Sequence, residues 1–163
     1  MYEPAEDSLI VAKVAEAVSV GARVACDLGC GAGLVAFSMS SKCEYVVAVD
    51  LDFRAVSCAK DRLPLDVWNV DFVCADALSA IRPSSLDVVA TNPPYLESLD
   101  GDLRWDGGTW GLEVPLKFAR SSARALREGG VLVILVSSLS PLRVFRECLV
   151  AYGYSLAYTS CVP

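Results

Sequence analysis

The feature that most constrains the fold of this 163-residue chain is an alternation of short apolar runs with segments of helical periodicity. Apolar runs such as Val88-Val89-Ala90 are typical of strands buried on both faces of a parallel sheet. We therefore expect an α/β fold with a doubly wound, mostly parallel sheet and helices on both of its faces. The predicted strands are 23–28, 45–50, 67–75, 86–91 and 131–136, with a last strand-like piece at 154–162, and the predicted helices are 5–18, 34–41, 52–63, 112–127 and 141–151. Gly129-Gly130 is expected to end the fourth helix, and Ser140 to cap the fifth.

Length and charge limit the classes of function that this chain can have. The length, without repeat or linker, predicts one domain over 1–163. A net charge of −6 argues against a protein that holds long duplexes through a phosphate-binding surface. The sequence has no apolar run near the roughly 18 residues of a membrane span, and its acidic start is unlike a signal peptide, so a cytoplasmic protein is expected.

The hydrophobic content is high for a domain of this size. Apolar residues make up 54% of the chain and the mean hydropathy is +0.44. A mostly buried parallel sheet would explain this surplus, and so would an apolar surface that binds a partner.

Cysteine and histidine usage argues against metal sites and common catalytic groups. The chain has no histidine, which excludes His-based acid–base catalysis and Ser-His-Asp triads. It has an odd number of cysteines without a CxxC pair, so neither a structural zinc site nor a disulfide framework is predicted. The seven cysteines are at positions 26, 30, 43, 58, 74, 148 and 161.

A glycine-rich turn follows the first predicted strand. Asp27 precedes three glycines, Gly29, Gly31 and Gly33, which allow a tight turn and close approach of a ligand to the backbone. The spacing is GxGxG and not the GxGxxG of dinucleotide-binding proteins. An acid at 27 suits an ammonium or sulfonium group better than a pyrophosphate.

Two more carboxylates end the next two strands. Asp50 can accept two hydrogen bonds from a ribose diol, and Asp76 can accept from an exocyclic amine. Since the carboxyl ends of parallel strands share one edge of a sheet, Asp27, Asp50 and Asp76 should meet there. Each of them could instead be a helix cap or an ordinary loop acid.

The fourth predicted strand runs into Asn92-Pro93-Pro94-Tyr95. The two prolines end the strand, because neither has an N–H to donate. Asn92 is pushed toward an extended backbone by the proline that follows it. The result is a stiff bend that presents a side-chain amide, the Pro93 carbonyl and an aromatic ring, although a Pro-rich turn without function would look the same.

Together these segments resemble the class I S-adenosylmethionine-dependent methyltransferases. The resemblance implies a cofactor site in which the glycine turn lies beside the methionine moiety, Asp50 at the ribose, and Asp76 with Ala77 near the adenine, with Leu51 as a further cofactor-binding residue. NPPY-type motifs belong to members that methylate nitrogen conjugated to a planar π system. The Asn92 side-chain carbonyl and the Pro93 carbonyl could each accept one N–H of such a nitrogen, while Tyr95 packs on the planar group.

The residues Tyr2–Ser8 and Trp105–Gly111 narrow the resemblance to the archaeal and eukaryotic HemK-like glutamine methyltransferases. That resemblance implies that the N-terminal segment, including Glu6, Asp7 and Ser8, folds over the cofactor and that Asn92 serves both halves of the site. It also implies N5-methylation of the glutamine in the GGQ loop of a translation termination factor, in a heterodimer with a small zinc-binding activator subunit. Strand 67–75, expected at the sheet edge with an apolar surface, is the predicted docking site for that subunit.

Several alternatives stay open at the level of sequence. An adenine-N6 methyltransferase acting on DNA or RNA would use the same motif, and a non-catalytic subunit with the same cofactor fold is a third possibility. The family's sheet ends in a two-stranded antiparallel hairpin, whereas only about ten residues follow Gly153 here, so at most one more strand is expected. Trp105 and Trp110 are either substrate clamps or loop packing.

Overall fold

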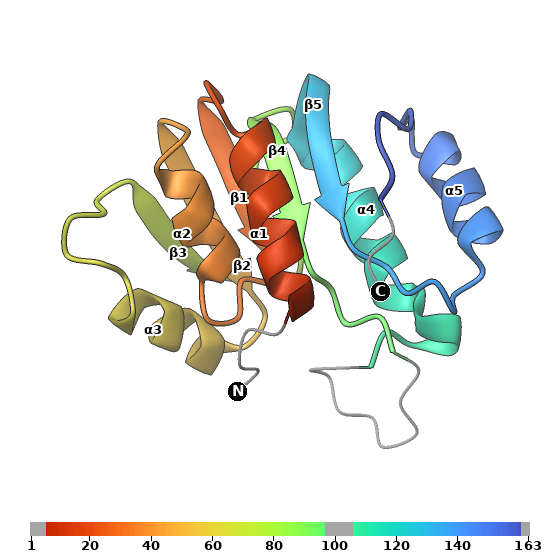
Figure 1. Cartoon of the computed structure of the whole chain (residues 1–163), viewed down its shortest axis with the longest axis horizontal. Coiled ribbons are helices and arrows are strands. Elements are labelled where there is room, and N and C mark those ends of the chain that lie inside the picture. The colour runs from red at the N-terminus through yellow and green to blue at the C-terminus, as the bar shows by residue number, and fades with distance from the viewer. Residues whose placement is uncertain (1–5, 97–105, 161–163) are drawn as a thin grey trace.

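The computed structural model describes residues 6–96 and 106–160 and contains the predicted doubly wound sheet (Figure 1). All five strands are parallel, and their order across the sheet is β3-β2-β1-β4-β5. The third strand therefore lies at one edge, as expected. The strands are β1 (Val24–Leu28), β2 (Tyr45–Asp50), β3 (Val70–Cys74), β4 (Leu86–Thr91) and β5 (Leu126–Ile134).

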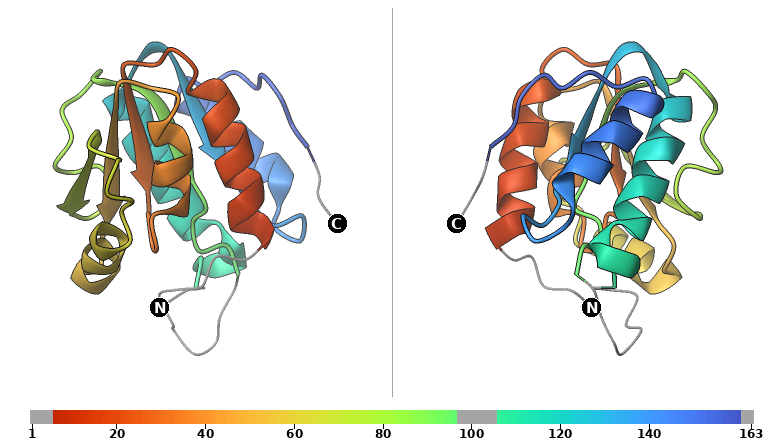
Figure 2. Two further views of the ribbon diagram at one scale, coloured as in Figure 1. Left: turned by 60° about the vertical axis from the view of Figure 1, so that its left-hand side comes forward. Right: turned by 90° about the vertical axis from the view of Figure 1, so that its right-hand side faces the viewer.

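Helices cover both faces of the sheet. α1 and α2 lie on one face and α4, with α5 beside it, lies on the other (Figures 1 and 2). β4 is the most protected strand, because all six of its residues are buried. The helices are α1 (Glu6–Val18), α2 (Leu34–Ser40), α3 (Phe53–Asp61), α4 (Glu113–Ala125) and α5 (Leu142–Ala151), and the 3-10 turn η1 spans Thr109–Gly111.

Two apolar clusters sandwich the sheet. One joins α1 and α2 to the sheet through residues such as Ala15 and Met39, and the other joins α4 through residues such as Ala125. None of the described helices has both the length and the apolar character that a membrane-spanning segment needs.

The prediction that Gly129-Gly130 ends a helix is wrong. α4 ends at Ala125, and β5 runs through both glycines. The register between β4 and β5 shifts here, because Leu86 pairs with Leu126 whereas Val88 pairs with Val131. A Cβ on Gly130 would lie 2.9 Å from the Arg127 carbonyl oxygen. The irregular pairing is a β-bulge, and Gly130 occupies a position in it that has no room for a larger side chain.

Two further predictions near the C-terminal end are also wrong. Pro141 is the N-cap residue of α5, and Ser140 makes no side-chain cap. Residues 154–160 form no strand, because Tyr154 turns back onto α4 and its hydroxyl donates to the Ala119 carbonyl at 2.9 Å. Positions 161–162 of that predicted strand lie outside the described residues.

Candidate active site

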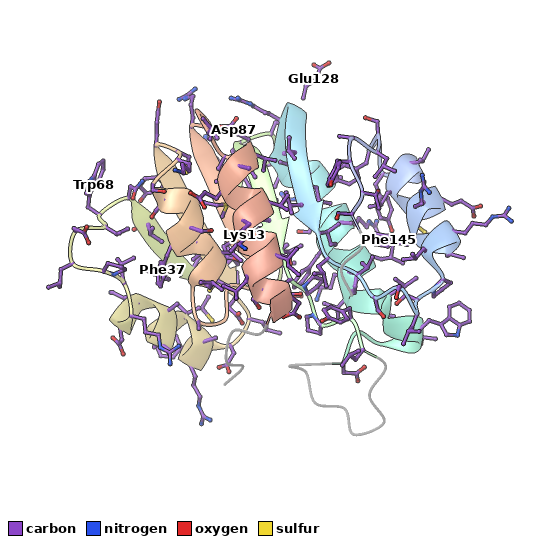
Figure 3. The ribbon with its side chains drawn as sticks, in the orientation of Figure 1. Lys13, Phe37, Trp68, Asp87, Glu128 and Phe145 are labelled. Carbon is purple, nitrogen blue, oxygen red and sulfur yellow. The ribbon has the colours of Figure 1, made fainter. Side chains whose placement is uncertain are left out.

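A cleft of about 700 Å³ opens at the carboxyl ends of β1 to β4. This is the edge at which open parallel sheets bind ligands. Asp87 and Glu128 lie near the opposite, amino ends of β4 and β5, at the top of Figure 3. The cleft is lined by Asp7, Leu28, Gly29, Gly31, Asp50, Leu51, Asp52, Arg54, Ala55, Ala75, Asp76, Ala77, Asn92, Pro93, Pro94, Tyr95, Leu96, Val114, Lys117 and Phe118.

The glycine turn presents backbone to this cleft. Gly29 and Gly31 have φ values of 75° and 52°, in the region that favours glycine. A Cβ on Gly31 would meet nothing within 4 Å, so the backbone faces open space at that point. Gly33 does not line the cleft: it is the N-cap of α2, and the Phe37 ring lies 2.6 Å from where its Cβ would be.

Asp27 lies beneath the turn and not in the cleft. Its side chain is buried, and Oδ2 accepts a hydrogen bond from the Ala36 N–H at 2.8 Å. The pKa of this carboxyl is raised to about 7, mainly by burial; the Ala36 N–H lowers it, and the nearby Asp50 contributes to the rise. The contact ties the first turn of α2 to β1, although the N-cap residue of α2 is Gly33.

Asp50 connects the glycine turn to the next loop. Its Oδ2 accepts from the Gly31 N–H at 2.9 Å and its Oδ1 from the Asp52 N–H at 2.9 Å. Leu51 follows it with its side chain 61% exposed at the cleft. Asp52 caps α3, accepting from the Arg54 N–H at 2.8 Å.

Asp76 and Ala77 line the far part of the cleft, where a lysine that the sequence reading missed joins them. Lys117 Nζ lies 2.5 Å from Asp76 Oδ1. Ala77 is a non-glycine residue with positive φ, at 46°. The only sequence signal for Lys117 is a basic residue in the second turn of the helix that follows the NPPY loop, which is too weak to assign a role.

The NPPY bend is held by the start of α1. Asn92 Nδ2 donates to Ser8 Oγ at 3.1 Å, and the Tyr95 hydroxyl donates to Asp7 Oδ2 at 2.6 Å. These partners are 84 and 88 positions apart in the sequence. The expected proximity of Asp7 and Ser8 to the site is thus observed, whereas the side chain of Glu6 lies outside the described part of the structure.

Asn92 Oδ1 is buried and has no hydrogen-bond partner among the described residues. A buried carbonyl oxygen without a donor is destabilising by roughly 1–3 kcal/mol, so such an atom calls for an explanation. An N–H group of a ligand in the adjoining cleft would satisfy it.

The glycine-rich segment after NPPY packs directly on the bend. The Gly107 N–H donates to the Leu96 carbonyl at 2.7 Å, and a Cβ on Gly111 would lie 2.1 Å from the Tyr95 carbonyl oxygen. Trp110 is 62% exposed and has a φ of 57°, which is strained for a bulky residue. Trp105 lies outside the described residues.

The parallel sheet and the cleft at its carboxyl edge are those of a Rossmann-like class I methyltransferase. The chain belongs to the methyltransferase small domain family, which matches residues 8–150. It is therefore an S-adenosylmethionine-dependent N-methyltransferase.

Similar proteins include enzymes with different acceptors. A Methanocaldococcus jannaschii protein assigned as a protein N5-glutamine methyltransferase is 34% identical over 148 residues, covering 86% of this chain and 74% of the relative. The Pseudomonas putida ribosomal RNA large subunit methyltransferase G is 36% identical over 121 residues, covering 70% of this chain but 29% of the relative. The E. cuniculi Mtq2–Trm112 complex, described as responsible for methylation of the eRF1 translation termination factor, superposes with a TM-score of 0.78 at 29% identity over 94% of this chain and 85% of that one.

Proposed function

We propose that this chain, as one catalytic domain, methylates the side-chain amide nitrogen of the glutamine in the GGQ loop of a translation termination factor. The observation that carries the proposal is the buried, unpartnered Oδ1 of Asn92 beside a cleft that also contains the glycine turn. The similarity to the M. jannaschii protein and to the E. cuniculi complex supports the choice of a protein glutamine.

The residues of the cleft fit S-adenosylmethionine. The open backbone at Gly31 suits the methionine moiety, and the half-buried Asp50 suits the ribose hydroxyls. We expect Asp76 and Ala77 to lie beside the adenine and Leu51 to be a further contact of the cofactor, since all three line the cleft. When bound, the cofactor supplies a methyl group on a positively charged sulfur. In this scheme Asp27 and Gly33 stabilise the conformation of the glycine turn and do not contact the cofactor.

The acceptor half of the cleft is suited to a planar amide. A glutamine amide nitrogen has a delocalised lone pair and is a weak nucleophile. Asn92 Oδ1 and the Pro93 carbonyl accept its two N–H bonds, which orients the nitrogen and favours the positive charge that develops on it. Ser8 holds the Asn92 amide so that Nδ2 is occupied and Oδ1 remains available to the substrate.

No strong base is needed at this site. The amide nitrogen becomes a strong acid once it carries the extra methyl group, and it then loses a proton to water. This agrees with a chain that has no histidine. Tyr95, fixed by its hydrogen bond to Asp7, packs its ring against the planar amide.

Mass spectrometry of the termination factor after incubation with isotope-labelled S-adenosylmethionine tests the proposal. We expect one labelled methyl group on the GGQ glutamine, and none when that glutamine is replaced by asparagine. An unmodified glutamine together with labelled adenine in added RNA or DNA would overturn the proposal in favour of a nucleic acid substrate.

We also propose that a small zinc-binding activator subunit adds a strand to the edge of β3. Among the described residues β3 pairs only with β2, so its outer backbone edge is open. The apolar surface is smaller than the sequence suggested, because Val70 is buried and Phe72 packs on the core. Trp68, just before the strand, is 85% exposed and points outward (Figure 3).

Expression with and without the activator tests this docking. We expect the chain alone to be poorly soluble or inactive, in keeping with a cytoplasmic heterodimer. A chain that is soluble, monomeric and fully active alone would contradict an obligatory partner. Trp68→Lys should weaken the complex, whereas the same change at the exposed Leu139 should not.

A further inference from the structure

A second, shallow groove of about 590 Å³ lies beside the cleft, between α4 and the turn that follows β3. It shares Asp76, Ala77 and Lys117 with the cleft, so the two are continuous. α4 begins at the carboxyl edge of the sheet and runs toward the opposite edge, beside α5 (Figure 2). The groove is lined by Asp76, Ala77, Ser79, Leu116, Lys117, Arg120, Ser121, Arg124 and Tyr152.

The groove is basic in a chain that is acidic overall. Lys117, Arg120 and Arg124 follow one another at helical spacing and lie on one side of α4. The only acid on α4 is Glu113, at its start, where it accepts from the Thr109 hydroxyl. Among the described residues that line the groove, Asp76 is the only acid, against a net charge of −6 for the whole chain.

Two of the cations are held in place by the facing turn. One terminal nitrogen of Arg124 donates to the Leu78 and Ile81 carbonyls at 2.6 and 2.8 Å, which leaves its other N–H donors for a ligand. Lys117 is tied to Asp76 at 2.5 Å. The turn after β3 is also joined to α4 by a hydrogen bond from the Leu78 N–H to Ser121 Oγ at 3.0 Å.

Arg120 lies between these two anchored cations. It is exposed and makes no ion pair or hydrogen bond to any residue in the described part of the chain. A guanidinium between two fixed cations, beside the hydroxyl groups of the groove, suits carboxylate ligands.

We propose that this groove binds an acidic, extended segment of the protein substrate while the glutamine occupies the cleft. The inference rests on the proposed function, because it takes the substrate to be a protein. Lys117 to Arg124 span about 10 Å along the helix, which matches three to four residues of extended peptide. Two or three carboxylates on such a segment could face the groove, whereas the acidic surface elsewhere would repel a long nucleic acid backbone.

Kinetics of the complex with the activator subunit, acting on the whole protein substrate, tests the proposal. Arg120→Glu should raise the KM for the protein substrate about three- to tenfold, more at low salt, with kcat and the cofactor Kd unchanged. Arg146→Glu is the matched control, since Arg146 is exposed on α5, outside both the cleft and the groove, and the variant has the same net charge. Equal KM values for the two variants would overturn the groove as a docking site while leaving glutamine methylation intact.

A binding experiment separates this proposal from the function on which it rests. A fluorescein-labelled six-residue glutamate peptide should bind the wild-type protein in low salt, with at least threefold weaker binding to Arg120→Glu and an unchanged Kd for Arg146→Glu. If a labelled single-stranded RNA of similar charge binds more tightly than the peptide and loses affinity in Arg120→Glu, the groove is a phosphate site and the proposal is wrong. Absence of glutamine methylation by the wild-type chain in complex with the activator would instead refute the proposed function.

Discussion

The two halves of the cleft are built in different ways. The half around the glycine turn consists of backbone and of one carboxylate, and its contacts join the ends of neighbouring strands, such as Asp50 to Gly31. The half around NPPY depends on side chains that are hydrogen-bonded to residues distant in the sequence, as Asn92 is to Ser8. The first half is therefore a property of the parallel sheet, whereas the second exists only when α1 packs in its place.

This comparison predicts that substitutions in the two halves of the cleft have different effects on turnover and on cofactor affinity. Damage to the NPPY half should reduce turnover while the cofactor still binds, and damage to the glycine-turn half should reduce cofactor affinity first.

Asn92→Ala should have the largest effect. It removes the acceptor of one substrate N–H bond, so kcat should fall by about 100- to 1,000-fold. Calorimetric titration should show that the cofactor Kd changes by less than about threefold. A large loss of cofactor affinity would mean that Asn92 shapes the cofactor pocket, and the separation of the halves would break down.

Asp50→Ala is the converse change. It should weaken cofactor binding by about 10- to 100-fold, because two charge-assisted hydrogen bonds to the ligand and the link to Gly31 are lost. At saturating cofactor, kcat should stay within a few-fold of wild type. A fall in kcat at saturation as deep as that of Asn92→Ala would place Asp50 in the chemical step.

Asp27→Asn tests the buried carboxylate through pH. The pKa of Asp27 is raised in the folded state to about 7 from 3.8, so the unfolded chain loses this proton first as pH rises. The contribution of Asp27 to the free energy of unfolding should thus be greatest at low pH and be lost as pH approaches 7. Between pH 5 and 8 the wild type should lose roughly 2–3 kcal/mol more than the variant, measured by urea unfolding.

The amide in that variant still accepts from Ala36, so the comparison isolates the charge. Parallel pH profiles for the two proteins would show that the buried group stays ionised throughout.

Gly111→Ala tests the backbone contact under the NPPY bend. Its φ is 67° and the new Cβ would clash with the Tyr95 carbonyl, so the free energy of unfolding should fall by about 2 kcal/mol and kcat/KM should fall with it. Gly129→Ala is the control, since its φ is 75° and its Cβ would meet nothing within 4 Å, and strain alone should be destabilising by about 1 kcal/mol. Equal losses in the two variants would show that the contact with Tyr95 is unimportant.

Ser8→Ala should have the smallest effect. It removes one hydrogen bond to Asn92, so kcat/KM should fall about three- to tenfold with an unchanged cofactor Kd. In the double variant Ser8→Ala/Asn92→Ala the loss should be no larger than for Asn92→Ala alone, because Ser8 acts through Asn92. Additive losses would mean that Ser8 contacts the substrate directly.

Much of the fold and of the cleft follows from local sequence patterns. The apolar runs and their spacing predicted the five parallel strands, and the usual strand order of such folds predicted the position of β3 at the edge. Strand ends mark the cleft because all parallel strands finish at the same side of the sheet. The Gly129-Gly130 prediction failed because a pair of glycines fits a helix end and a bulge equally well, and only the partner strand distinguishes them.

By itself, then, the sequence determined the α/β sheet, the glycine turn and the NPPY bend, which depend on residues close together in the chain. Only the tertiary structure decided that Asp27 is buried under the turn, that Lys117 pairs with Asp76, and that the start of α1 holds Asn92 and Tyr95. The physical reason is range: periodicity and turn chemistry act over a few residues. Burial and the pairing of side chains more than 40 positions apart arise only once helices pack on the sheet.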